Sequence, residues 1–276
     1  MPELAELNPL EFAALAGLVR EHTGIAMHEH KRVLLQGRLL PRLRALGIAS
    51  WAGYIERLAS DRTEVTSFID SVTTNDTVFF RTPAVWAWLS ETFLPAFAAQ
   101  HRAAPLRIWS AAAATGEEAY SLAMSCLEYQ AHAPGLRFEI LGTDISHAAL
   151  ATARAGAYRG RSVERFEADR PALFRKYLVA HGDGVKVGPA VAQHVRFDQH
   201  NLLGRPPRGA AFDLVMLRNV LIYFDAEHQQ QVLAGARAAM GPSARLVLGE
   251  QESITRLQTA FTFEQAHVYR IGGEPS

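Results

Sequence analysis

The stretch Trp109-Ser-Ala-Ala-Ala-Ala-Thr-Gly-Glu-Glu-Ala-Tyr-Ser121 decides the fold of this chain of 276 residues. The apolar residues Leu106 to Trp109 predict a buried strand, and the residues after Gly116 predict a helix. Between the two, four alanines and Gly116 leave room for a ligand to approach the backbone closely. We therefore expect a strand, a ligand-binding loop and a helix in direct succession.

The charge of this loop indicates which ligand it accepts. Phosphate-binding loops present glycines, free amides and usually a lysine, whereas this loop presents Glu117 and Glu118. Two carboxylates repel phosphate and favour a nucleoside with a positive centre and an amino-acid tail, a description that S-adenosylmethionine fits. The alternative is an ordinary helix start, with Thr115 as N-cap and Glu118 at the third helical position.

The composition excludes several broad classes of protein. Lys and Arg number 28 and equal Asp and Glu at 28, so no overall field attracts nucleic acid. Cys126 is the one cysteine, which rules out a disulfide within the chain and is typical of a buried core residue. The first residues lack a signal-peptide pattern, and no apolar run reaches the roughly 20 residues of a membrane helix. We expect a cytoplasmic protein without membrane insertion.

Two different patterns divide the chain. Residues 1–75 have helical periodicity, with a start at Asn8-Pro9 and a break at Gly47, and predict a small all-helical domain. In residues 76–276 short apolar runs alternate with helical segments, which predicts a parallel α/β sheet of the doubly wound type. The predicted strands lie at 106–109, 138–141, 195–197, 214–217 and 246–248, with 267–271 as an added antiparallel edge strand.

Residues 169–193 differ from the rest of the second region. The sequence Gly182-Asp-Gly184 is flanked by alternating side chains, a pattern typical of a tight hairpin. We expect a small β-subdomain inserted into the α/β domain.

Polar side chains follow the predicted strands, where ligands bind in doubly wound sheets. Asp144 ends the second strand and is expected to accept hydrogen bonds from ribose hydroxyls, the alternative being an N-cap for a helix at 146–155. Asn201 and Leu202 follow the third strand and could recognise the edge and face of an adenine, unless Asn201 is only a turn residue. Arg218, Asn219 and Tyr223 follow the fourth strand.

At this point the chain resembles a known family, the CheR-type glutamate O-methyltransferases that modify bacterial chemoreceptors. The resemblance spans most of the chain. Its carriers are Thr73-Thr-Asn-Asp-Thr-Val-Phe-Phe-Arg81, Thr115-Gly-Glu-Glu118, Gly142-Thr-Asp-Ile145, Asn201-Leu-Leu203 and Arg218-Asn-Val-Leu-Ile-Tyr-Phe224. The chain departs from the family pattern in three places: Ala114 replaces Ser, Ala119 replaces Pro, and Gly249-Glu-Gln-Glu252 replaces Gly-His-Ser-Glu.

The resemblance implies a Rossmann-like methyltransferase domain with a small inserted β-subdomain, preceded by the helical domain. It implies S-adenosylmethionine as cofactor, S-adenosylhomocysteine as product, and glutamates on the cytoplasmic helices of chemoreceptors as substrate. The cofactor residues that it implies are Asn75, Thr77, Arg81, Glu117, Asp144, Asn201, Leu202, Leu217 and Arg218.

A glutamate nucleophile has a pKa of about 4.3 and is already ionised at neutral pH, so its methylation needs no strong base. The scattered histidines, which predict no metal site, agree with such a reaction. The chain must instead orient the reactants, and we expect Arg81 and Tyr223 to do so near the methyl group.

Substrate docking has a separate signal in the helical domain. From Lys31 to Ile55 the chain has no acidic residue, and Arg38 and Arg42 share one helix face. Acidic receptor helices would be attracted to this face, although an ordinary solvated face is the alternative.

Two other functions compete with the receptor methyltransferase. One is a regulatory protein that binds the cofactor without turnover. The other is a methyltransferase for small molecules or nucleic acid, against which the neutral charge and the lack of an Asn-Pro-Pro-Tyr type motif count. We expect a monomer.

Overall fold

Four helices build the N-terminal part of the chain: α1 (Pro9–Thr23), α2 (Arg32–Leu46), α3 (Trp51–Ser60) and α4 (Arg62–Val72), with a short η1 (Glu29–Lys31) before α2. The structure is a computed structural model that describes residues 6–100, 104–209 and 211–272. Asn8 and Glu11 form a capping box that starts α1, and Gly47 ends α2 in the left-handed conformation. Leu15, Leu39 and Phe68 are fully buried where the helices meet, so this helical domain has a core of its own.

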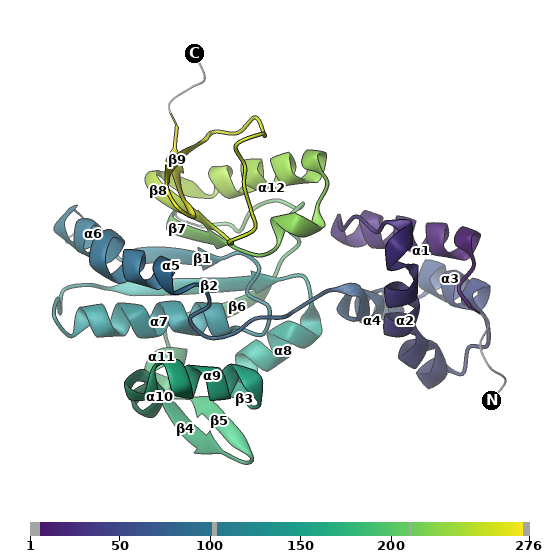
Figure 1. Cartoon of the computed structure of the whole chain (residues 1–276), viewed down its shortest axis with the longest axis horizontal. Coiled ribbons are helices and arrows are strands. Elements are labelled where there is room, and N and C mark those ends of the chain that lie inside the picture. The colour runs from purple at the N-terminus through teal and green to yellow at the C-terminus, as the bar shows by residue number, and fades with distance from the viewer. Residues whose placement is uncertain (1–5, 101–103, 210, 273–276) are drawn as a thin grey trace.

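An extended segment leads from α4 to the main body of the molecule, beside which the helical domain lies (Figure 1). It is followed by α5 (Pro83–Trp88), the π-helical η2 (Leu89–Phe93) and α6 (Leu94–Gln100). These helices join the same core as the adjoining face of the large sheet.

A seven-stranded sheet forms the centre of the main body, in the order β6-β2-β1-β7-β8-β10-β9. The first five strands of this order run parallel. Their bounds are β1 (Leu106–Ser110), β2 (Phe138–Asp144), β6 (Val195–Gln199), β7 (Phe212–Leu217) and β8 (Met240–Leu248), with β9 (Phe261–Gln265) and β10 (Val268–Ile271) completing the sheet. The chain builds outward from β1 to β6 and then returns to β7, so the switch in strand order lies between β1 and β7.

Helices cover both faces of this sheet, as Figure 1 shows, and neighbouring strand residues therefore enter different cores. Ile108 packs with α7 (Glu117–Gln130) and α8 (His147–Ala155) on one face. Trp109 packs with α12 (Ala226–Ala238) on the other. This double burial explains why the strands have continuous apolar runs.

A second sheet of three strands, β3 (Ala157–Tyr158), β4 (Leu178–His181) and β5 (Gly184–Val187), lies apart from the first. Strands β4 and β5 form the antiparallel hairpin expected around Gly182-Asp183. The small sheet begins earlier than residue 169, because β3 pairs with β5. Helices α9 (Arg161–Asp169) and α10 (Pro171–Tyr177) lie between β3 and β4 in the chain, and α11 (Pro189–Ala192) follows β5.

One strand differs from its predicted place. Strand β10 is antiparallel, as expected, but it lies between β8 and β9 and is therefore not the edge strand. The segment Phe261–Gln265, which was not predicted as a strand, forms the edge of the sheet: it pairs with β10 alone, and its residues after Phe261 are exposed. Within the described ranges, no helix combines the length and the apolarity needed to span a membrane.

Candidate active site

An open cleft of about 930 Å³ lies at the carboxyl ends of β1, β2 and β7, at the switch in strand order. Three parts of the chain line it: the helical domain through Thr23 and Ile25, the extended segment at 73–78, and the loops after the strands. Eight of the predicted site residues line this cleft: Asn75, Thr77, Arg81, Asp144, Asn201, Leu202, Arg218 and Tyr223.

Asp144 is held at the cleft by two main-chain amides. The amide of Ala114 donates to Oδ2 over 2.8 Å, and the amide of Ser146 donates to Oδ1 over 2.9 Å. The carboxyl group is buried, and burial raises its pKa above the ordinary aspartate value. Ser146, and not Asp144, caps α8, because its hydroxyl accepts from the amide of Ala149. The alternative role of Asp144 as a helix cap is therefore wrong.

The loop after β1 enters α7 through a strained backbone. Ala114 has a φ of 47°, and Gly116 is the N-cap with a φ of 96°. A Cβ atom at Gly116 would lie 2.9 Å from the Cβ of Ala153, so only glycine fits there. Thr115 is not the N-cap, and its hydroxyl donates instead to Oε2 of Glu117 over 2.6 Å. The ordinary capped helix start is thus not what the structure contains.

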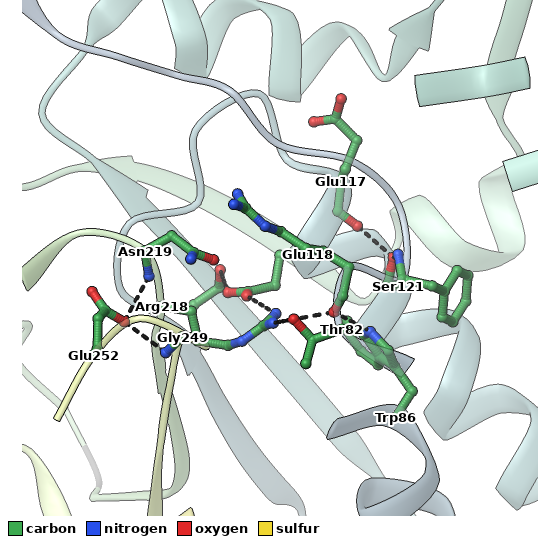
Figure 2. A network of polar contacts seen from close by, with 12 residues as sticks. Thr82, Trp86, Glu117, Glu118, Ser121, Arg218, Asn219, Gly249 and Glu252 are labelled. Carbon is green, nitrogen blue, oxygen red and sulfur yellow. Dashed lines mark hydrogen bonds and ion pairs between the residues drawn. The ribbon is translucent and has the colours of Figure 1, made fainter. Parts of the chain in front are cut away.

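The two glutamates at the start of α7 have different surroundings, and Figure 2 shows their carboxylates directed apart. Glu118 lines the cleft, where Ser110 donates to its Oε1 over 2.8 Å. Glu117 faces the second sheet's helix α9 and accepts from Thr115 and Ser162, and burial raises its pKa. The structure therefore brings Glu118, in place of the predicted Glu117, to the cleft.

Arg218 lines the cleft and takes part in a dense polar network (Figure 2). One guanidinium nitrogen contacts Oε2 of Glu118 at 3.0 Å, and the other donates to the hydroxyl of Thr82 at 2.6 Å. The Nε atom of Arg218 is buried and has no hydrogen-bond partner among the described residues. This unpartnered donor in the cleft wall fits a ligand with an acceptor atom.

Asn201 joins the cleft to the helical domain. Its amide nitrogen donates to the carbonyl oxygen of His22 over 2.9 Å, and its Oδ1 accepts from the amide of Leu203. Nearby, the amide of Ala26 donates to the carbonyl oxygen of Tyr223. The helical domain therefore forms one wall of the cleft and contacts the loop that carries Tyr223.

The side chains of Arg81 and Tyr223 line the cleft with most of their hydrogen-bonding groups unpaired. Arg81 makes one long contact of 3.3 Å to the carbonyl oxygen of Asp76. The hydroxyl of Tyr223, which lines the cleft, has no hydrogen-bond partner among the residues that the structure describes. Both groups are half-buried and available to a carboxylate or another polar ligand.

Besides Glu117, three predicted site residues do not line the cleft: Leu217, Arg38 and Arg42. Leu217 is fully buried in the core on the α12 side of the sheet. Arg38 donates to the carbonyl oxygen of Val72 and to the hydroxyl of Thr74. Arg42 forms an ion pair with the buried Glu64. Both guanidinium groups are thus used inside the helical domain, which argues against free docking charges at these positions.

The sequence did not predict a role for two polar residues, Thr82 and Glu252, that hold other residues of the site in place. Thr82, at a φ of 66°, accepts from Arg218. Glu252 is buried and accepts from the main chain of the loop after β7. The only available signal was the glutamate that ends Gly249-Glu-Gln-Glu252, which matches the family pattern at its last position.

A parallel sheet with a cleft at its switch point and a buried aspartate after the second strand defines a Rossmann-like domain that binds a nucleoside cofactor. Residues 75–270 match the family described as "CheR methyltransferase, SAM binding domain", and residues 10–73 match "CheR methyltransferase, all-alpha domain". The chain belongs to the CheR methyltransferase family. Its cofactor is S-adenosylmethionine, and the predicted fold class and cofactor are confirmed.

Curated relatives agree with this assignment. A chemotaxis protein methyltransferase of Escherichia coli is 33% identical over 278 residues, covering 98% of this chain and 94% of the relative. One from Vibrio parahaemolyticus is 34% identical over 260 residues, covering 92% of this chain and 93% of the relative. The chain is a methyltransferase of the chemotaxis type, and the alternative of a regulatory protein without turnover is not favoured.

Proposed function

We propose that this enzyme methylates glutamate side chains on the cytoplasmic helices of chemoreceptors and forms glutamyl methyl esters. The observation that carries the proposal is that Arg81 and Tyr223 line the same cleft as Asp144 and have hydrogen-bonding groups free to bind a substrate. These two groups suit an anionic, already ionised substrate that has to be oriented. The relatives are named chemotaxis protein methyltransferases, which supports a protein of the chemotaxis system as the substrate.

Each part of the cleft has a role in this proposal. The carboxylate of Asp144 accepts hydrogen bonds from the ribose hydroxyls, and Asn201 and Leu202 contact the adenine. The carboxylate of Glu118 lies where it can hold the positively charged end of the cofactor. Asn75, Thr77 and Arg218 complete the walls.

The bound cofactor supplies an electrophilic methyl group, and the chain supplies orientation. The guanidinium of Arg81 holds the incoming carboxylate, since its planar group binds carboxylates through two hydrogen bonds. The hydroxyl of Tyr223 fixes the attacking oxygen without taking its charge. His200 also lines the cleft, but burial lowers its pKa, which keeps it neutral and suits a reaction that needs no acid.

Docking of the receptor helix is proposed for the basic surface of α2 and η1. Because Arg38 and Arg42 are bound within the domain, the free positive charges of the run are Lys31 and Arg44, which have no ion-pair partner among the described residues. They lie at the end of η1 and in α2 of the helical domain, which also forms a wall of the cleft. Positive charges there would attract an acidic receptor helix.

The deciding experiment is the transfer of labelled methyl groups from S-adenosylmethionine to a receptor cytoplasmic fragment. We expect label in the fragment that mild base releases as methanol, because esters hydrolyse in base. A matched fragment with its acceptor glutamates changed to alanine should stay unlabelled, and the Asp144→Ala enzyme should label the fragment more slowly. Label that withstands base, or that appears equally in the alanine fragment, would contradict the proposal.

A further inference from the structure

The carboxylate of Glu252 lies at the centre of four main-chain amides. Its Oε1 accepts from the amides of Val220 and Leu221 at 2.8 and 2.7 Å. Its Oε2 accepts from the amides of Asn219 and Gly249 at 2.8 and 2.6 Å. Both oxygens are thus saturated by the backbone, and the carboxyl group is buried. No role in binding the cofactor follows from this geometry, because Glu252 does not line the cleft.

The loop that Glu252 holds has a backbone that needs an external anchor. Asn219 has a φ of 59°, in the left-handed region that costs free energy for a residue other than glycine. Three successive amides, from Asn219 to Leu221, point to one side of this loop and have no partner in a helix or strand. A carboxylate satisfies all of them at once.

Close approach of the chain at Gly249 fixes the position of the Glu252 carboxylate. A Cβ atom at Gly249 would lie 2.7 Å from Oε2 of Glu252 and 2.8 Å from the amide nitrogen of Asn219. The turn at Gly249 and the loop after β7 therefore approach closely enough for one carboxylate to join them, as Figure 2 shows.

The two ends of the loop are anchored separately. Arg218 is held on the cofactor side by Glu118 and Thr82. The far end, η3 (Leu221–Tyr223), is held through carbonyl oxygens, which accept from Gln229 and from the amide of Ala26. Glu252 alone, among the described side chains, holds the amides of the turn between these ends.

We propose that Glu252 is a positioning residue that sets the Asn219–Tyr223 turn so that the hydroxyl of Tyr223 reaches the attacking carboxylate. This assignment rests on the proposed role of Tyr223. Because Arg218 has its own anchors, loss of the Glu252 carboxylate should impair methyl transfer more than cofactor binding.

The test variant is Glu252→Gln, which keeps the shape of the side chain but replaces one of the two acceptor oxygens by an NH₂ group. One pair of main-chain amides then faces a donor and loses its acceptor. The neighbouring Glu250→Gln is the control, since Glu250 is exposed. By hydrogen exchange of the intact enzyme, one amide pair, either 220 and 221 or 219 and 249, should exchange at least about tenfold faster in Glu252→Gln and remain unchanged in Glu250→Gln. Unchanged exchange of all four amides would overturn the proposal.

Kinetics then separate positioning from general damage. We expect Glu252→Gln to lower the transfer rate at saturating cofactor by about tenfold to a hundredfold, with less than about a threefold change in S-adenosylhomocysteine affinity. In the Tyr223→Phe background the same change should cost little, because both act through one hydroxyl. Equal rate losses in the two backgrounds would overturn the positioning role. If the wild-type enzyme forms no base-labile methyl product, the proposed function fails, whereas the exchange data still decide whether Glu252 holds the turn.

Discussion

Arg42 and Glu64 form a two-pronged ion pair inside the helical domain, with Nε of Arg42 at 2.8 Å from Oε1 and one terminal nitrogen at 2.5 Å from Oε2. The hydroxyl of Tyr54 donates to the same carboxylate over 2.8 Å. Glu64 is 1% exposed, so this pair compensates a buried charge. Arg42, on the basic face of α2, therefore stabilises the helical domain. Its effect on stability can be tested separately from docking by the other basic residues of this region.

The Arg42→Ala variant should lose about 2–4 kcal/mol of unfolding free energy, because it leaves the Glu64 carboxylate buried without its cation. Urea denaturation followed by circular dichroism measures this loss. Arg44→Ala, at an exposed position on the same helix, is the matched control and should change stability by less than about 0.5 kcal/mol. Similar unfolding midpoints for the two variants would show that the ion pair is not structural.

Reversal of the free charges tests docking without this loss of stability. The double variant Lys31→Glu, Arg44→Glu should methylate an acidic receptor fragment about tenfold more slowly at low salt, and should bind S-adenosylhomocysteine like the wild type. The wild-type rate should fall as salt is added, because a Debye length of about 8 Å screens exposed charges at physiological ionic strength. Arg256→Glu, Arg270→Glu, in exposed positions outside the helices of the helical domain, gives the control. Equal rates for the two double variants would remove the docking surface from the helical domain.

The pH dependence of cofactor affinity should report Asp144. Burial raises the pKa of this carboxyl, so acidification protonates it at a higher pH than an ordinary aspartate of about 3.9. Ribose hydroxyls donate more strongly to the ionised carboxylate than to the protonated group, and S-adenosylhomocysteine affinity should therefore fall as the pH is lowered toward that raised pKa. Calorimetry of Asp144→Asn should give weaker binding, by about tenfold, that no longer depends on acidic pH. A wild-type profile that coincides with that of Asp144→Asn would contradict the assignment.

Tyr223→Phe removes one hydroxyl and keeps the ring, which isolates the orientation of the substrate. The single-turnover rate of methyl transfer should fall by about tenfold or more, and S-adenosylhomocysteine affinity should change by less than about twofold. Rapid-quench measurements at saturating cofactor supply the rate, and calorimetry supplies the affinity. Equal losses in both would make Tyr223 a cofactor contact only.

Local chemistry in the sequence was sufficient for much of the architecture. The Asn8-Pro9 start and the Gly47 end of the helices were predictable because caps and left-handed glycines act within a few residues. The same holds for the hairpin at Gly182-Asp183 and for the buried strands, whose continuous apolar runs follow from helices on both faces of the sheet. Asp144 was predictable as well, since residues at strand ends meet at the switch point of a parallel sheet.

What only the tertiary structure decided depends on residues far apart in the chain. The sequence presents Glu117 and Glu118 side by side, but only the packing of α9 and of Arg218 around them turns the first away from the cleft and the second into it. In the sequence Arg42 looks like an exposed, unpaired charge, because Glu64 contacts it only in the folded domain. The role of Glu252 likewise depends on the loop after β7, which lies against its carboxylate only in the tertiary structure. Periodicity and capping act over a single turn, whereas ion pairs and amide contacts between distant segments exist only after the chain has folded.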